Sequence, residues 1–250
     1  LENMGLKVIT ENPFTVSPRD VGIDVRIHDF GVEVDGEFSL HDVRNKFQEL
    51  FVRIWHGEVE NDAFNRLVLL GNLNWREVVI LRAYARYTRQ TGSAFSQAYM
   101  AKTLANNPAL ASALVSLFIA RFDPDRDPAK GDEVAAIEAD IISRLEDVMN
   151  PDEDRILRAF LNLVQSTLRT NFFQHDADGN PKSYLSVKFN SAVIEDLPLP
   201  RPWREIFVYS PRVEAVHLRG GPVARGGIRW SDRQEDFRTE ILGLVKAQMV

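Results

Sequence analysis

The stretch NWREVVILRAYARYTRQTG, residues 74–92, carries both the start and the stop signals of an α-helix. Asn74 is of the type that caps a helix N-terminus, and Glu77, three residues later, completes a capping box. Gly92 is of the type that ends a helix, because glycine readily adopts the left-handed conformation found there. The sequence therefore predicts a well-delimited helix near the middle of the chain.

Similar signals on both sides of this stretch extend the helical region. Asn107 with Pro108, and Asn150 with Pro151, mark two further helix starts. Apolar residues recur at helical spacing over residues 40–57, 107–124, 131–148 and 150–173. We therefore predict a bundle of helices over residues 39–173, with Ser39 as the cap of its first helix.

Both ends of the chain have the composition of β-structure instead. Residues 6–16 and 24–34 are rich in β-branched and aromatic residues, and Ser17-Pro18 between them indicates a turn. Residues 174–190 contain Asp178-Gly179, a hairpin signal, and strands are expected over 204–211 and 213–219. A final helix is expected after Ser231. The fold class predicted is α+β, with boundaries near residues 38 and 173.

Composition narrows the function. The 250 residues include no cysteine, which excludes disulfides and thiol catalysis and suits a reducing, cytoplasmic environment. The longest apolar run, residues 110–120, is shorter than the roughly 20 residues that a membrane-spanning helix needs. The net charge is −6, but residues 201–250 hold nine Lys and Arg against six Asp and Glu. A local positive excess in an acidic chain favours a small anionic ligand over nucleic acid.

The positive excess centres on VHLRGGPVARGGIRWSDRQEDF, residues 216–237. Glycines allow close approach of backbone amides, arginine forks match carboxylates or phosphates, and a helix N-terminus follows. Together they predict a pocket for a small anion. The alternative is a tight turn whose arginines pair with Asp232, Glu235 and Asp236. An RNA contact of the RGG type is disfavoured, because such contacts occur in repetitive disordered segments.

Other candidate residues have simpler interpretations. The five histidines show no ligand spacing, so no metal site is expected. His217 precedes the Arg/Gly stretch and is a possible supporting residue, although a strand histidine is more often structural. Residues 123–134 lack the glycine and glutamate of a calcium-binding loop. Three arginines, Arg82, Arg86 and Arg89, are expected to form a solvated or acid-paired face of one helix. Four aromatic residues are expected in the core: Trp55, Trp75, Tyr84 and Phe95.

Three stretches resemble one family. The stretch HLRGGPVARGGIRWSDRQEDFRTEILGLVKAQMV, residues 217–250, resembles the opening of the catalytic domain of the large bacterial NAD-specific glutamate dehydrogenases. LENMGLKVITENPFTV with RIHDFGVEV, and LNWREVVILRAYARYTRQ, resemble segments upstream of that domain. The resemblance implies that residues 1–38 end an ACT-like regulatory domain, 39–173 form a helical linker domain, and 174–250 begin the substrate domain.

The resemblance also implies roles for individual residues. The family has a Lys-Gly-Gly-x-Arg motif that binds a substrate carboxylate, and here it is Arg225-Gly226-Gly227-Ile228-Arg229. Gln248 occupies the family position three residues before a substrate-binding lysine. These four residues, Arg225, Gly226, Gly227 and Gln248, are therefore expected to bind substrate, with Arg229 and His217 in support. Lys246 lies too early to be the family lysine and is expected on a helix surface.

The resemblance finally implies an oxidoreductase. The whole protein would oxidatively deaminate L-glutamate to 2-oxoglutarate with reduction of NAD, as a homo-oligomer without membrane or nucleic-acid partners. The catalytic lysines and the NAD-binding domain are expected beyond Val250, so this chain is expected to be an inactive segment of a longer enzyme. The alternative is a non-catalytic regulatory or assembly module in which the Arg/Gly stretch only braces the structure.

Overall fold

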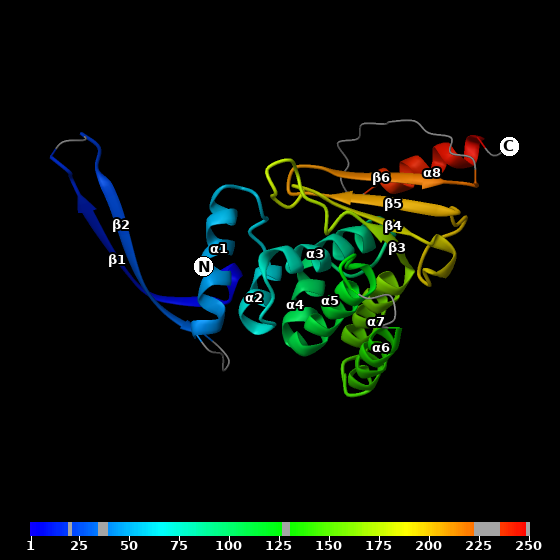
Figure 1. Cartoon of the computed structure of the whole chain (residues 1–250), viewed down its shortest axis with the longest axis horizontal. Helices are drawn as coiled ribbons and strands as arrows, with labels where there is room; N and C mark the ends of the chain where they lie inside the picture. The colour runs from blue at the N-terminus through cyan, green and yellow to red at the C-terminus, as the bar shows by residue number, and fades with distance from the viewer. Residues whose placement is uncertain (20–21, 35–39, 127–130, 223–235, 249–250) are drawn as a thin grey trace.

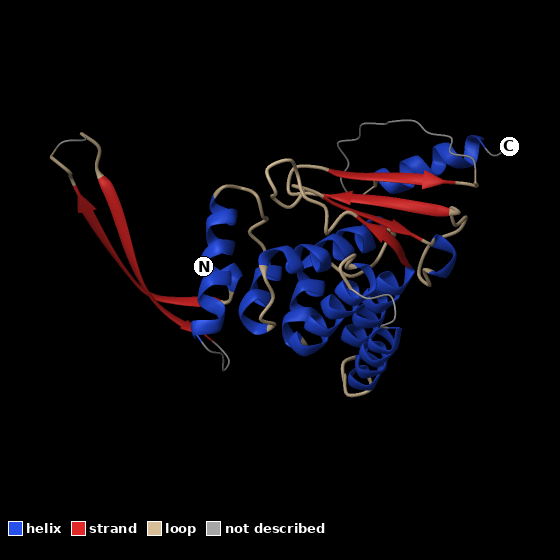
Figure 2. Ribbon diagram, viewed as in Figure 1, coloured by secondary structure: helices blue, strands red, loops and turns tan. Residues whose placement is uncertain are grey.

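The computed structural model describes residues 1–19, 22–34, 40–126, 131–222 and 236–248. In this part of the chain an arm of two strands projects from a body in which a sheet lies on a group of helices (Figures 1 and 2). Strands therefore occur near both ends and helices between them. The predicted α+β class is confirmed.

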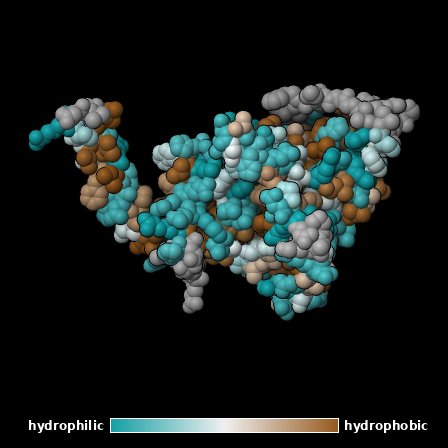
Figure 3. Space-filling model, in the orientation of Figure 1, coloured by the Kyte–Doolittle hydropathy of each residue, from teal (hydrophilic) through white to brown (hydrophobic). Residues whose placement is uncertain are grey.

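The arm is an antiparallel hairpin of β1 (Leu6–Val16) and β2 (Val25–Val34), with a bulge between Val8 and Thr10. Its apolar side chains lie on one face near the base and on the other face toward the tip, as the pairs Val8–Val32 and Phe14–Ile27 show. Figure 3 shows these apolar side chains at the surface of the arm. The predicted pair of strands is confirmed. The expected turn at Asp35-Gly36 and the cap Ser39 lie outside the described residues.

The helical group begins with α1 and includes two short one-turn segments. Its long helix α3 (Trp75–Gln90) has the predicted capping box: the Asn74 side chain accepts from the Glu77 amide at 2.9 Å, and the Glu77 carboxylate accepts from the Asn74 amide at 2.8 Å. The Asn150 side chain caps α7 by accepting from two amides. The remaining elements are α1 (Leu40–Trp55), η2 (Ala63–Arg66), α2 (Leu67–Leu70), α4 (Gln97–Asn106), α5 (Pro108–Phe122), α6 (Gly131–Leu145) and α7 (Pro151–Ser166).

The sheet has the order β3-β4-β5-β6 and is antiparallel throughout. Residues alternate along β4 and β5 between buried and half-buried, so one face of the sheet packs on the helices. The ring of Tyr87 from α3 stacks on Phe189 with centroids 4.4 Å apart, and Tyr84 bonds Thr167 through its hydroxyl at 2.8 Å. The strands are β3 (Thr167–Thr170), β4 (Leu185–Phe189), β5 (Arg204–Tyr209) and β6 (Glu214–Arg219).

The structure corrects two expectations. Helix α7 ends at Ser166, and residues 167–170, expected to be helical, form β3. Pairing of this short, β-branched segment with Val187–Phe189 outweighs its helical apolar spacing. Trp55 was expected in the core but is 79% exposed at the end of α1, whereas Tyr84 is buried as expected.

The last described helix, α8 (Phe237–Gln248), lies beside β6 at the edge of the sheet (Figure 1). Among the described residues no single helix is long and apolar enough to cross a membrane. Helices α4 and α5 pass that test only as a pair, and they are bent by 100° at their junction.

Candidate functional site

The Arg/Gly stretch itself lies outside the described residues. Arg225, Gly226, Gly227 and Arg229 fall within residues 223–235, and Gln248 is described only as the last residue of α8. The elements on either side of the stretch are described. Strand β6 leads into it and α8 follows it, so these two elements form the frame of the predicted anion pocket.

A buried charge network holds α8 in this frame. The Arg238 guanidinium donates from Nε to Glu205 Oε2 at 2.9 Å and from Nη2 to Glu205 Oε1 at 2.5 Å. The Tyr87 hydroxyl donates to Glu205 Oε2 at 2.8 Å, and the Arg238 amide donates to the Gln90 side chain at 3.3 Å. One buried carboxylate in β5 thus links the first turn of α8 to helix α3.

Burial makes this network sensitive to charge. Arg238 and Glu205 are almost completely buried. Burial alone would lower the pKa of Arg238, but its hydrogen bonds and charge pairing with Glu205 raise it. Burial, together with the Glu205 charge, also raises the pKa of Tyr87 well above its ordinary value. Arg238 is therefore held as a cation and Tyr87 as a neutral donor.

His217 lies on the other face of the sheet. It is half-buried in β6 opposite Ile206, while its neighbour Leu218 is buried opposite Glu205. Its ring consequently points away from the Arg238–Glu205 network. The structure does not bring His217 together with that network, and its supporting role stays a prediction.

The face that carries His217 is strongly cationic. Arg169 is opposite Lys188 across β3 and β4, and Arg204 is opposite Arg219 across β5 and β6. Arg204 bonds the Asn190 side chain, Arg219 bonds the Pro222 carbonyl, and both guanidinium groups lie over the Trp203 ring. Lost hydration and the charges of the three arginines lower the pKa of Lys188. Sequence reasoning missed this face, because each strand contributes a single Lys or Arg and only the pairing of the strands brings them together.

The arginine line on α3 is acid-paired. Arg82 is buried and bonds both carboxylate oxygens of Asp62 at 2.8 Å, and Arg86 bonds Glu60 at 2.8 and 2.9 Å. Arg86 also lies 3.5 Å from Glu214 of β6. Arg89 donates to the carbonyls of Ser93 and Phe95. Of the two expected alternatives, solvated or acid-paired, the structure shows acid pairing for Arg82 and Arg86.

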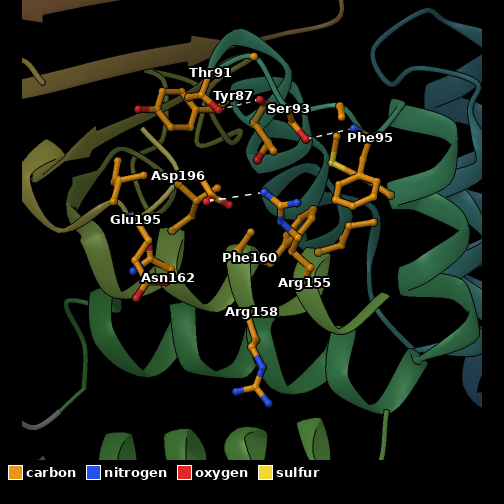
Figure 4. Close-up of a pocket in the computed structure, with 18 of the residues that line it drawn as sticks. Tyr87, Thr91, Ser93, Phe95, Arg155, Arg158, Phe160, Asn162, Glu195 and Asp196 are labelled. Carbon is orange, nitrogen blue, oxygen red and sulfur yellow. Dashed lines mark hydrogen bonds and ion pairs between the residues drawn. The ribbon is translucent and has the colours of Figure 1, made fainter. Parts of the chain in front are cut away.

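A cavity of about 460 Å³ lies where the end of α3 meets α7 and the loop before β5 (Figure 4). Arg155 and Asp196 face one another across it at 3.9 Å, whereas Arg158 extends away from it. Thr88 and Thr91, which line it, donate their hydroxyls to backbone carbonyls of α3. The cavity therefore offers one loose ion pair and is separate from the frame of β6 and α8.

Metal ligation finds no support in the described part of the chain. No group of three or more His, Asp or Glu side chains is placed there to hold an ion.

Comparison with known proteins covers the chain in three parts. The family described as "Glutamate dehydrogenase, ACT3 domain" matches residues 1–44, and "Glutamate dehydrogenase, helical motif 3" matches residues 59–124. "Bacterial NAD-glutamate dehydrogenase, catalytic domain" matches residues 140–250. The matches thus follow the arm, the helices and the sheet in order.

Whole-chain relatives carry a consistent name. The chain is 50% identical to NAD-specific glutamate dehydrogenases of Halomonas elongata and Pseudomonas aeruginosa, and 48% identical to that of Mycobacterium tuberculosis, over its full length. It spans only 15% to 16% of the length of these relatives. By sequence and domain order, the chain belongs to the bacterial NAD-glutamate dehydrogenase family.

Proposed function

We propose that this chain is the part of an NAD-dependent glutamate dehydrogenase that joins a regulatory region to the substrate domain. In this proposal residues 1–38 belong to an ACT-like domain, 39–173 to a helical linker domain and 174–250 to the substrate domain. The observation that carries it is the full-length match, at about half identity, to relatives named NAD-specific glutamate dehydrogenase. The substrates of the whole protein would be L-glutamate and 2-oxoglutarate.

The chemical role of this chain is to bind and orient a substrate carboxylate. Arg225 supplies a permanent cation, and Gly226 and Gly227 leave backbone amides accessible because they carry no side chain. Fixing both ends of a dicarboxylate orients its Cα–H for transfer, which contributes several kcal/mol to catalysis. The buried Arg238–Glu205 pair supports the role, because it fixes the start of the helix that ends at Gln248.

The residues present do not fit an NAD site. The sequence contains no Gly-x-Gly-x-x-Gly turn of the kind that binds a dinucleotide pyrophosphate at a helix N-terminus. We therefore assign no hydride-transfer step to this chain. NAD would be bound elsewhere in the longer protein, and the purified 250-residue chain should reduce no NAD with glutamate; glutamate-dependent NADH formation by it would contradict this part.

The test of the binding role uses the full-length enzyme. Arg225→Ala should lower kcat/KM for glutamate by roughly tenfold to a hundredfold, because a charge-assisted hydrogen bond is lost, with the KM for NAD unchanged. Arg144→Ala, which removes an exposed arginine of α6, serves as the matched control. An unchanged KM for glutamate together with a lower melting temperature would favour the alternative, in which the Arg/Gly stretch braces the structure.

The exposed arm supports a proposal about assembly. Phe14, Val25 and Ile27 are each about half exposed in a two-stranded hairpin that, along most of its length, contacts no other described element. Apolar strands of this kind are buried in working proteins. We place the arm inside the completed ACT-like domain or against another subunit of a homo-oligomer; the oligomeric state of the full-length protein with Phe14→Asp would report on it.

A further inference from the structure

A second cleft lies between the start of α3 and the loops at one end of the sheet. Its volume is about 720 Å³, and the loops over residues 176–185 and 208–213 form one wall. The loop before β4 passes over the start of α3, where the Lys182 carbonyl accepts a hydrogen bond from Arg76 (Figure 1). Its described lining shares no residue with that of the cavity of Figure 4.

Arg76 is the unusual residue of this cleft. Its side chain is only 9% exposed, yet its one described hydrogen bond is that from Nη1 to Lys182 O at 2.8 Å. The Nε and Nη2 atoms are buried and have no hydrogen-bond partner among the described residues. The guanidinium lies against the rings of Trp75 and Phe172, 5.9 and 5.2 Å from their centroids. A buried N–H group without an acceptor reduces the stability of the fold, so these two donors indicate that an acceptor binds here.

Two other buried arginines, Arg82 and Arg238, indicate the chemical class of this acceptor. Arg238 binds both oxygens of Glu205 through Nε and Nη2, and Arg82 binds both oxygens of Asp62 through the same two nitrogens. This edge of the guanidinium fork fits a planar carboxylate in a bidentate manner. In Arg76 the same edge is empty. The acceptor it lacks is therefore a carboxylate.

Within the described part of the chain, no acidic side chain pairs with Arg76. Burial and the nearby Arg53 charge lower the pKa of Arg76 to about 10, whereas paired Arg82 and Arg238 have raised pKa values. Arg76 is also the second residue of α3, where the helix dipole disfavours a cation. An anion bound here would offset the cost of burial, the repulsion from Arg53 and the unfavourable helix dipole.

The acids that line the cleft are already engaged. Glu58 pairs with Arg53 at 2.7 Å. Asp176 accepts from the amides of Asp178 and Asn180 within its own turn, which lowers its pKa. Two further cations, Lys182 and Arg212, line the same cleft. Its charge therefore favours an anionic ligand from outside the described fold.

The apolar lining sets the rest of the ligand. The walls include several apolar side chains: Trp75, Val79, Val208, Pro211 and Val213. We propose that this cleft binds a small organic carboxylate, with its carboxylate on the Nε–Nη2 edge of Arg76 and its hydrocarbon body against Trp75 and the β5–β6 turn.

The experiment follows the Nε–H groups of arginine by ¹⁵N NMR in the purified chain. Arg76→Gln assigns the Arg76 signal. Hexanoate should shift that signal in a saturable manner, and hexanamide, which has the same body without the charge, should not. The proposal would be overturned if the chemical shift of the Arg76 Nε–H group did not change at saturating hexanoate. Equal chemical-shift changes with hexanamide would also overturn it.

Calorimetry with the same probe gives an independent readout. Arg76→Gln should weaken hexanoate binding by roughly tenfold or more, the effect of losing a charge-assisted pair. Arg158→Gln, which removes an ion-paired surface arginine on α7, should bind hexanoate as the parent does. Equal weakening by both substitutions would show only a general charge effect and would contradict the site.

Discussion

Arg238 of α8 and Glu205 of β5 form a bidentate ion pair with side chains 1% and 0% exposed. The Tyr87 hydroxyl also donates to Glu205, so strand β5, helix α3 and helix α8 share one carboxylate. Buried pairs of this kind are costly to break from one side, because the remaining charge stays in a medium that solvates it poorly.

Breaking the pair from one side should therefore destabilise the protein strongly. Glu205→Gln or Arg238→Met is expected to lower the free energy of unfolding by about 3–5 kcal/mol, measured by urea denaturation. The triple variant Tyr87→Phe/Glu205→Leu/Arg238→Met, which leaves no orphaned polar group, should recover most of that loss. Arg144→Gln, in an exposed pair with Asp140, should leave stability unchanged. Equal losses for the single and triple variants would mean that packing, not charge, dominates.

Two buried tyrosines should respond oppositely to loss of the hydroxyl. Tyr209 is buried and its hydroxyl has no partner among the described residues, whereas the Tyr87 hydroxyl donates to Glu205. Tyr209→Phe should leave the free energy of unfolding unchanged or raise it, while Tyr87→Phe should lower it by about 1–3 kcal/mol. Urea denaturation of both variants measures these changes. A large decrease in the free energy of unfolding of Tyr209→Phe would contradict the prediction and indicate that the Tyr209 hydroxyl has an acceptor.

Alkaline pH should unfold the protein through its buried tyrosines. Burial raises the pKa of Tyr84, Tyr87 and Tyr209 above the ordinary value of 10. The unfolded chain therefore loses these protons first, so their contribution is fully present below pH 10 and is lost as pH rises toward the folded pKa values. Each should reduce stability by about 1.4 kcal/mol per pH unit above that point. Phenolate absorbance should rise together with loss of circular dichroism; ionisation of all tyrosines before unfolding would contradict this.

Removing like-charge repulsion on the cationic face of the sheet should raise the stability of the protein. Lys188 faces Arg169 directly across β3 and β4, and like charges in such pairs are destabilising. Lys188→Glu should raise the free energy of unfolding by about 0.5 kcal/mol, with Lys188→Gln giving a smaller gain. Added salt should reduce the difference, because Arg169 is exposed and Lys188 is only half-buried. A salt-independent gain would point to packing instead.

Local signals in the sequence predicted the ordered helices well. The capping box of Asn74 and Glu77, and the Asn150 cap, need only neighbours within a few residues, so they can be identified without knowledge of the fold. Strands β5 and β6 were predicted for a similar reason, since two short runs with apolar residues flank the turn signal Ser210-Pro211. Such features are fixed by short-range chemistry.

Features that depend on distant partners escaped prediction. Strand β3 exists because residues 167–170 pair with a strand about twenty positions later, and nothing local distinguishes them from the end of α7. The burial of Arg238 depends on Glu205, Tyr87 and Gln90 from two other elements. The exposure of Trp55 follows from where α1 ends, not from its hydrophobicity. The substrate roles of Arg225, Gly226, Gly227 and Gln248 stay predictions.

The attachment of α8 to α3 has a mechanical consequence. The amide of Arg238 is held by Gln90 at the far end of a sixteen-residue helix whose start lines the Arg76 cleft. Because an α-helix is stiff, a movement at the start of α3 also moves its end at Gln90. A tilt of α3 at its Arg76 end would therefore displace the first turn of α8, so occupancy of the cleft could alter the position of α8.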